Sequence, residues 1–236
     1  MLTKYPFENK AEELNEKIIA GLSRRKFLGY AGAATGLVAF ATACDKNDND
    51  MNREGVDLGS GDFGILNYAY ALEQLEAAFY TKVLETPYSG ITAMETSFMA
   101  DIRDHEIAHR EFFKAALGSN AIQALEVNFE SINFSSRASV LGTAKAFEDL
   151  GVSAYNGAGK LLADPVFLGL AGKIVSVEAR HAALIRELLD TSGTAFANAE
   201  VVDAMGLDVS RMPSEVLQIA SAFLKTKINA SNLPTS

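Results

Sequence analysis

Apolar residues recur three and four positions apart through four long stretches of the chain, which is the spacing of amphipathic or buried helices. These four stretches cover residues 63–85, 93–117, 137–162 and 165–189. Gly118 is typical of a helix end, and Asp164 followed by Pro165 is typical of a helix start. A shorter fifth helix is expected over residues 213–228. The pattern therefore predicts an all-α fold.

The connections between the four long helices differ in length. Short turns join the first helix to the second and the third to the fourth, whereas residues 118–136 separate the second from the third. A four-helix bundle with one long crossover has this order, while an up-down-up-down bundle needs only short loops. Within the crossover, residues 125–129 can form a short extended piece.

The N-terminal region resembles an export signal. Arg24 and Arg25 precede a weakly apolar run of about 15 residues, Gly29–Ala43, which is too short to cross a bilayer comfortably. This order resembles a twin-arginine signal, and the alternative is an N-terminal amphipathic helix with a chance arginine pair. Small residues before Cys44 resemble a lipobox, while signal cleavage beside an unmodified Cys44 is the alternative.

These features divide the chain into four parts. We expect a signal over residues 1–44, a disordered polar tether over 45–62, the bundle over 63–190 and an extension with a short helix over 191–236. Lipidation of Cys44 would anchor the exported protein to a membrane. The predicted location is the periplasm or cell envelope, and the acidic stretch after Cys44 resembles tags that send lipoproteins to the outer surface.

Composition narrows the chemistry further. The 236 residues are 48% hydrophobic and 22% charged, with a formal net charge of −9, which is typical of a packed globular domain. An acidic chain repels phosphate backbones, so nucleic acid is not an expected partner. The single cysteine excludes an internal disulfide and any site built from several cysteines.

Two of the three histidines stand in the same local pattern, Glu-x-x-His. Glu106 precedes His109 in the second predicted helix, and Glu178 precedes His181 in the fourth. A spacing of three places both side chains on one helix face. A single such pair is usually an exposed ion pair, so its meaning depends on what accompanies it.

A glutamate within an apolar helix precedes each pair. Glu73 stands 33 residues before the glutamate of the first pair, and Glu148 stands 30 residues before that of the second. Each is followed seven positions later by a tyrosine, Tyr80 or Tyr155. The chain thus contains two similar halves, and because a buried unpaired carboxylate is costly, these glutamates are interpreted as ligands.

Four carboxylates and two imidazoles suit a dinuclear metal centre. Four negative charges balance two divalent ions, and one imidazole for each ion leaves a position for oxygen, peroxide or water. The same donor set is known from di-iron and di-manganese carboxylate bundles. We therefore expect two iron or manganese ions as cofactors. The predicted ligands are Glu73, Glu106, His109, Glu148, Glu178 and His181.

Residues next to these ligands are candidates for orienting them. The candidates are Glu76, His105, Tyr80, Tyr155 and Asp149. Glu73 is preferred to Glu76 as the ligand because of the tyrosine seven positions later. For His105, the alternative to this role is an ordinary histidine on the surface or in the core. No residue is assigned a catalytic role.

Residues 63–190 resemble the ferritin-like superfamily, and the two Glu-x-x-His pairs are closer to bacterioferritin, rubrerythrin and manganese catalase than to storage ferritins. Leu72–Tyr80 and Phe147–Ala158 resemble more narrowly the exported desiccation-related proteins. The resemblance implies a ferritin-like four-helix bundle with the ligands named above. The chain lacks the four cysteines of a rubredoxin domain, so rubrerythrin-type electron transfer is not expected.

Two kinds of function follow from this resemblance. The first is an oxidoreductase of peroxidase, catalase or ferroxidase type that handles peroxide, oxygen or ferrous iron in stress defence. The alternative is a metal-binding or structural envelope protein without turnover. Metal ions, a small oxidant and a membrane reached through Cys44 are the expected partners, and the fifth helix offers a face for capping the bundle or forming a homodimer.

Overall fold

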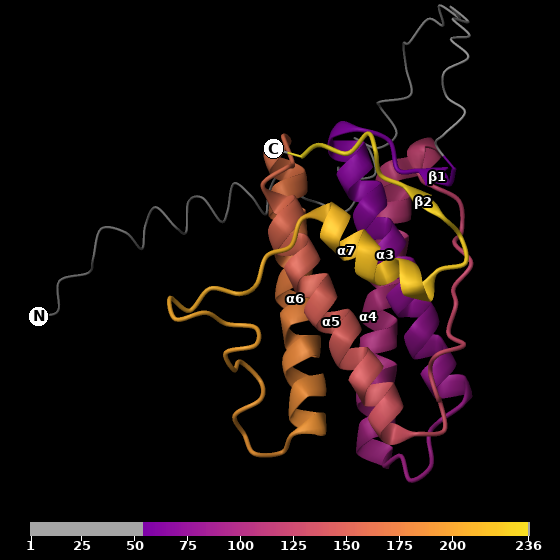
Figure 1. Ribbon diagram of the computed structural model, residues 1–236, viewed down its shortest axis with the longest axis vertical. Coiled ribbons are helices and arrows are strands. Elements are labelled where there is room, and N and C mark those ends of the chain that lie inside the picture. The colour runs from indigo at the N-terminus through magenta and orange to yellow at the C-terminus, as the bar shows by residue number, and fades with distance from the viewer. Residues whose placement is uncertain (1–53, 236) are drawn as a thin grey trace, which may run out of the picture. The chain divides into compact units, whose positions relative to one another are not determined.

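The computed structural model describes residues 54–235. Four long helices lie side by side and a short fifth helix crosses them (Figure 1). They are α3 (Gly61–Glu85), α4 (Ala93–Leu117), α5 (Arg137–Gly159), α6 (Pro165–Leu189) and α7 (Pro213–Ala220). The all-α bundle predicted from the sequence is confirmed. The predicted signal and Cys44 lie outside the described residues. None of the described helices combines the length and the apolar character needed to cross a membrane.

Local side-chain hydrogen bonds explain where α4 and α6 begin. The Thr92 hydroxyl accepts from the Glu95 backbone N–H at 3.1 Å, and the Glu95 carboxylate accepts from the Thr92 N–H at 2.9 Å, which together form a capping box. Asp164 caps α6 by accepting from Val166 N–H at 2.8 Å. The start of α6 could be predicted from its cap, Asp164 followed by a proline.

The third helix ends three residues earlier than predicted, at Gly159 instead of 162. Proline disfavours the helical conformation in the residue before it, and Asp164 precedes Pro165. The Asp62 carboxylate also accepts from the Ala163 and Asp164 backbone N–H groups, both at 2.8 Å. A side chain about 100 positions earlier thus takes the donors that a longer helix would use.

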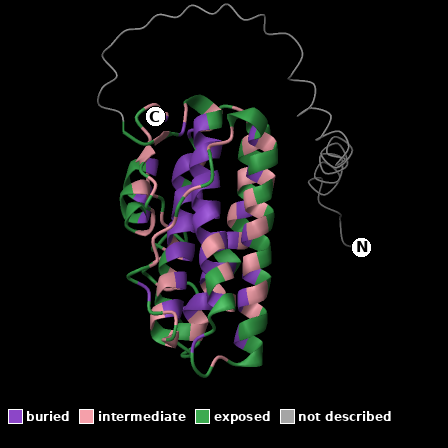
Figure 2. Cartoon of the chain, turned by 90° about the vertical axis from the view of Figure 1, so that its right-hand side faces the viewer, coloured by how far each residue is buried: buried purple, intermediate pink, exposed green. Residues whose placement is uncertain are grey.

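Helix α3 forms the centre of the bundle. Seventeen of its 25 residues are buried, compared with six of the 25 in α6, and buried positions line the interior of the bundle (Figure 2). Helix α3 packs along α4 and also contacts α5, which packs along α6. The crossover between α4 and α5 runs the length of the bundle (Figure 1). Ligands on all four helices therefore face one shared interior.

Regular structure begins before the end of the tether that was predicted over residues 45–62. Strand β1 (Val56–Asp57) pairs in parallel with β2 (Ile228–Asn229), and Leu58 has no exposed surface. Helix α3 begins at Gly61. Residues 54–60, predicted as part of a disordered tether, are held by a strand about 170 positions away, and such a partner leaves no local pattern in the sequence.

The fifth helix is shorter than predicted, ending at Ala220 instead of 228. A 3-10 turn, η2 (Ser221–Phe223), follows, and Leu224 then forms an antiparallel bridge with Val127. The extended piece predicted within the crossover is therefore present, and its backbone bonds draw the C-terminal segment out of the helical conformation. Helix α7 buries Val216 and Ala220 against the bundle.

Candidate metal centre

The four long helices bring the six predicted ligands into one buried cluster. Their carboxylates have no exposed surface, and the histidine side chains are 13% and 5% exposed. Within the cluster, two groups of four residues each place one ligand atom per residue within 4.8 Å of the others. The groups are Glu73, Glu106, His109 and Glu178, and Glu106, Glu148, Glu178 and His181. Glu106 and Glu178 belong to both groups, which is the arrangement of bridging carboxylates.

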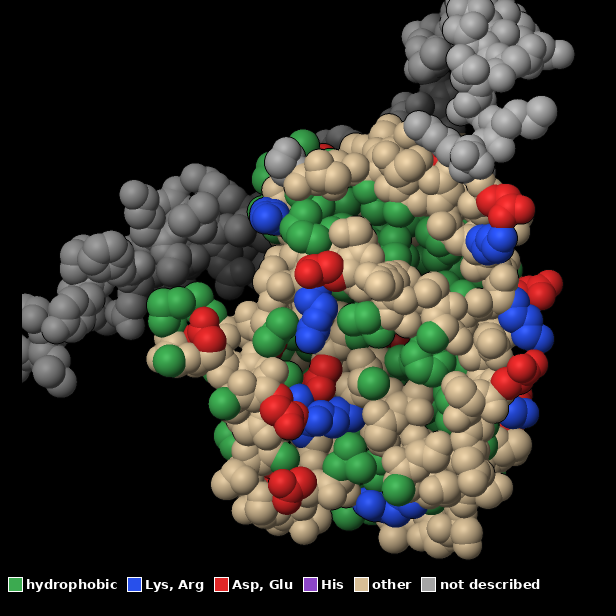
Figure 3. All heavy atoms as spheres, viewed as in Figure 1, with side chains coloured by type: hydrophobic (Ala, Val, Ile, Leu, Met, Phe, Trp, Pro, Cys, Tyr) green, Lys and Arg blue, Asp and Glu red, His purple; other side chains and the backbone are tan. Residues whose placement is uncertain are grey.

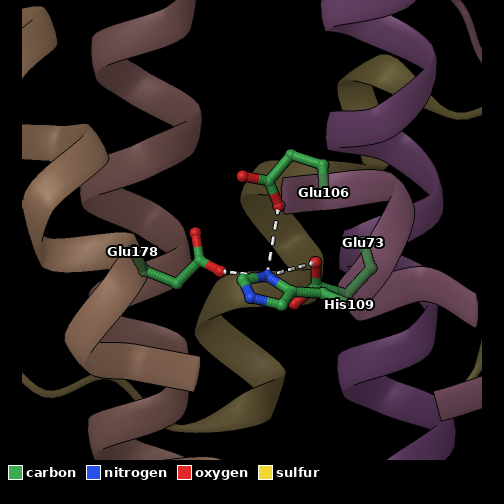
Figure 4. A group of neighbouring side chains, drawn as sticks. All are labelled: Glu73, Glu106, His109 and Glu178. Carbon is green, nitrogen blue, oxygen red and sulfur yellow. Dashed lines mark ion pairs between the residues drawn. The ribbon is translucent and has the colours of Figure 1, made fainter. Parts of the chain in front are cut away.

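In the first group, three carboxylates surround the His109 imidazole (Figure 4). Its Nδ1 atom lies 2.7 Å from Glu178 Oε1, 3.5 Å from Glu73 Oε2 and 3.7 Å from Glu106 Oε2. Helices α3, α4 and α6 each supply one of these carboxylates. The group can therefore hold a metal ion only when the two helix pairs are packed together.

The second group repeats this geometry around His181. Its Nδ1 atom lies 2.8 Å from Glu106 Oε1, 3.4 Å from Glu178 Oε2 and 3.5 Å from Glu148 Oε2. Each imidazole is closest to the glutamate of the opposite Glu-x-x-His pair. The sequence repeat therefore corresponds to two equivalent halves of one site.

The cluster contains most of the unpaired buried polar atoms among residues 54–235. Eleven buried side-chain nitrogen or oxygen atoms of the described residues lack a hydrogen-bond partner, and eight of them lie here. The eight are Glu73 Oε2, both oxygens of Glu106, His109 Nδ1, Glu148 Oε2, both oxygens of Glu178 and His181 Nδ1. A buried polar atom without a partner is costly. Because these atoms converge, and because oxygen and imidazole ligands suit iron and manganese, the donor set fits metal ions.

The pKa values of the cluster show how strongly its charges interact. Burial alone would lower the pKa of His109 and His181, but the surrounding carboxylates outweigh it and raise both pKa values to about 12. Burial alone would raise the pKa of Glu106, yet the two imidazoles hold it at about 2. Burial, together with the charge of nearby glutamates, raises the pKa of Glu148 to about 8 and raises that of Glu73. Positive charge is thus strongly favoured at the centre of the cluster.

Two tyrosines hold the outer carboxylates in place, and they do so across the repeat. The Tyr155 hydroxyl on α5 donates to Glu73 Oε1 on α3, while the Tyr80 hydroxyl on α3 donates to Glu148 Oε1 on α5. The other oxygen of each glutamate faces the cluster. Each tyrosine therefore fixes a ligand of the opposite half, which places both among the neighbours that the sequence predicted.

His105 contacts the back of His181. Its Nδ1 lies 2.9 Å from His181 Nε2, and the two rings are stacked with centroids 5.1 Å apart. His105 itself is exposed. Since His181 Nδ1 faces the carboxylates, His105 can fix which nitrogen of His181 carries the proton and how its ring is oriented.

Glu76 is a fifth buried carboxylate, although it belongs to neither group of candidate ligands. Burial and then the charges of Glu106 and other glutamates of the cluster raise its pKa well above the ordinary value. Its Oε1 lies 3.1 Å from the point where a Cβ would stand on Gly151. Gly151 holds the position in α5 that Glu76 holds in α3, three residues after the helix's ligand. Alignment of the two halves would have found this glycine, which the sequence interpretation missed.

Asp149 does not contact the ligands. It accepts two hydrogen bonds from Arg186, at 2.8 and 2.7 Å, and Arg186 also pairs with Glu200 at 3.2 Å. The prediction that Asp149 orients an imidazole is thus replaced by a role in joining α5, α6 and the following loop.

On the face of the molecule that Figure 3 shows, acidic and basic side chains are interleaved, and no large area carries charge of one sign.

A comparison with protein families agrees with this architecture. A family model described as a ferritin-like domain matches residues 61–191, which is more than half of the chain and includes every candidate ligand. Among curated proteins, no significant match to the chain was found.

Proposed function

Because the chain belongs to the ferritin-like family, we propose that it binds two divalent iron or manganese ions and uses them to process a small oxidant. The observation that carries this proposal is the convergence of eight unpaired buried atoms from four helices. Without a bound cation, four buried carboxylates would have only two imidazoles as positively charged partners, which leaves part of their negative charge unbalanced. Two cations are the simplest partners that satisfy all of them.

The residues divide into terminal and bridging ligands. Glu73 and His109 would hold one ion and Glu148 and His181 the other, and the two glutamates that belong to both groups, Glu106 and Glu178, would serve both ions. The four carboxylates balance the charge of two divalent ions, and the bound ions supply redox and Lewis-acid chemistry. Iron and manganese both accept this donor set, so the supply of metal decides between them.

The surrounding protein positions the carboxylates of this centre and shields them from water. The four carboxylates have no exposed surface, so bulk water is excluded and every electrostatic contact is strengthened. Tyr80 and Tyr155 fix the terminal carboxylates, and His105 fixes the ring of His181. The proposed substrates are peroxide, oxygen or ferrous iron, and the proposed context is stress defence.

The proposed place of action rests on the sequence alone. The arginine pair and apolar run of residues 1–44 support export across the cytoplasmic membrane, and Cys44 supports a lipid anchor at the periplasmic or outer surface. A twin-arginine route carries folded proteins, which would allow metal loading before export. A homodimer is a further proposal, which sedimentation of the purified chain tests directly.

Metal analysis joined to kinetics tests the function. The full chain is expressed with iron and manganese available, beside a Glu106→Ala/Glu178→Ala variant and a control, Glu85→Ala/Glu111→Ala, whose glutamates are exposed. Mass spectrometry should find about two metal ions per chain in the wild type and the control and none in the first variant. Oxidation of Fe²⁺ by oxygen and by peroxide should be faster with the first two proteins than with free Fe²⁺ alone.

Each result has one meaning. Metal with turnover supports the redox function, whereas metal without turnover supports the alternative of a metal-binding envelope protein. No metal in a folded wild-type protein would refute both, and a purely structural role would then explain the fold.

A further inference from the structure

A small apolar cavity lies between α3, α4, α5 and α6, close to one half of the metal centre. Its volume is about 20 Å³. Its walls are aliphatic and aromatic, with no charged or amide side chain. The residues that line it include Leu66, Ala69, Leu72, Phe113, Ala154 and Tyr155. Gly159 and Leu162, which are only partly buried, also line it, so the cavity approaches the surface at that end.

The cavity is one helical turn from the Glu73 and His109 half of the centre. Ala69 stands four positions before Glu73 on α3, and Phe113 stands four positions after His109 on α4. The Phe113 ring stacks on Tyr155 with centroids 6.4 Å apart, and the Tyr155 hydroxyl donates to Glu73. One aromatic ring thus contacts both the cavity and a terminal ligand.

The other half of the centre has a different environment. The corresponding tyrosine, Tyr80, has no exposed surface and packs edge-to-face on Phe79 with centroids 5.1 Å apart. It belongs to the larger apolar cluster of the bundle, whereas Tyr155, Ala69 and Phe113 belong to a smaller one. The repeat therefore places two similar ligand sets beside unlike apolar surroundings.

Size and polarity restrict what the cavity can hold. A cavity needs about 10–15 Å³ to hold one water molecule, and a buried water needs two to four polar partners. This cavity is large enough for one such molecule but offers at most one side-chain partner, the Tyr68 hydroxyl, because the Tyr155 hydroxyl is engaged with Glu73. Water, peroxide and hydrated cations are thus disfavoured, whereas a small apolar molecule is not.

We infer that this cavity is a docking site for dioxygen, from which the oxidant reaches the Glu73 and His109 half of the centre. The inference rests on the proposed redox function and narrows its oxidant: dioxygen is small enough for the cavity and needs no hydrogen bond. Peroxide would have to enter by another route. The half of the centre beside Tyr155 is then the first to meet oxygen.

Xenon, which binds in apolar cavities of proteins, tests the cavity itself without any metal. We would record ¹²⁹Xe NMR spectra of metal-free wild-type protein and of two variants that fill the cavity, Ala69→Leu and Ala171→Leu; Ala171 lines the cavity from α6. Ala115→Leu, on the exposed face of α4, is the control for an added leucine. Thermal unfolding identifies the variants that fold, and the two positions lie on different helices, so at least one is expected to be usable. Xenon should bind to the wild type and the control only.

The kinetic measurement uses the same proteins loaded with iron. Filling the cavity should slow oxidation by dioxygen about tenfold, since access then limits each turnover, and should leave oxidation by peroxide within about twofold of the wild type. No xenon binding by the wild type, or equal loss of both activities in the filled variants, would overturn the inference. Unchanged oxidation by dioxygen would overturn it as well. Failure of the proposed function is a different result, namely a wild-type protein that binds xenon but holds no metal or shows no turnover.

Discussion

Replacement of Glu73 by glutamine separates the cost of the metal-free cluster from the gain on metal binding. The raised pKa of Glu73, caused by burial and the charge of Glu178, shifts this carboxyl toward its neutral form in the metal-free protein. Glutamine has the shape of that neutral form and keeps an oxygen that can accept from Tyr155. Because folding raises the pKa of the Glu73 carboxyl, this group destabilises the fold increasingly as the pH rises above the pKa that it has in the unfolded chain. Metal-free Glu73→Gln should therefore unfold at the same temperature as the wild type or higher.

With metal bound, the wild type should instead unfold at a higher temperature than Glu73→Gln. At a free metal concentration of about 100 times Kd, each occupied site stabilises the fold by about 2.7 kcal/mol, so two sites give about 5 kcal/mol. For a folded region of 182 residues, 1 kcal/mol corresponds to a Tm shift of about 2–4 °C. The wild type should thus gain about 10–20 °C on adding Mn²⁺, and the variant, which keeps the ligands of one site, about half of that.

Differential scanning calorimetry with a chelator and with Mn²⁺ measures both effects. The matched control is Glu85→Gln, an exposed glutamate on the same helix, which should behave as the wild type in both conditions. The reasoning would be refuted if metal-free Glu73→Gln unfolded more than about 4 °C below the wild type, about 1 kcal/mol for a chain of this size. An undiminished metal shift in the variant would refute it equally.

Three further predictions concern the neighbours of the ligands. Tyr80→Phe and Tyr155→Phe should each weaken one of the two metal sites about 10–100-fold, because each removes the donor that orients one terminal carboxylate; competition with a chelating dye measures this. Gly151→Ala places a methyl group 3.1 Å from Glu76 Oε1 and should cost about 1–3 kcal/mol in urea unfolding, whereas Gly142→Ala in the same helix meets nothing within 4 Å and should not destabilise. Mn²⁺ affinity should rise with pH, since without metal the pKa values of the imidazoles are raised to about 12 and that of Glu148 to about 8 and binding must displace these protons; equal affinities in calorimetric titrations at about pH 6 and about pH 8 would refute proton release by the ligands.

The candidate ligands could be predicted because each is part of a recognisable pattern in the local sequence. A Glu-x-x-His spacing fixes two side chains on one helix face, and a glutamate among apolar residues on a helix such as α3 has to be buried with a partner. The repeat then restricts which glutamates belong together. The structure brings Glu73, Glu106, Glu148 and Glu178 together with both histidines, so the pattern contained enough information for the whole donor set.

Features that depend on distant partners could not be predicted. Strand β1 exists because residues 228–229 pair with it, and α5 stops early partly because Asp62 binds the backbone after it. Asp149 could equally face a histidine or Arg186, since both stand on α6, and only the packing of the helices decides for the arginine. In each case the structure depends on a contact between segments far apart in the sequence, and no pattern of apolar residues indicates that the two segments meet.

The repeat therefore accounts for the ligands but not for the difference between the two halves. Tyr155 contacts an apolar cavity on one side of the centre, while His105 links His181 to the exposed surface on the other. Glu76 has no counterpart, because Gly151 stands at the equivalent position and leaves the space that Glu76 fills. Two ions with matching ligands would thus have an apolar cavity beside one half and a histidine that reaches the surface beside the other. This difference between the two halves depends on residues outside the repeated motif.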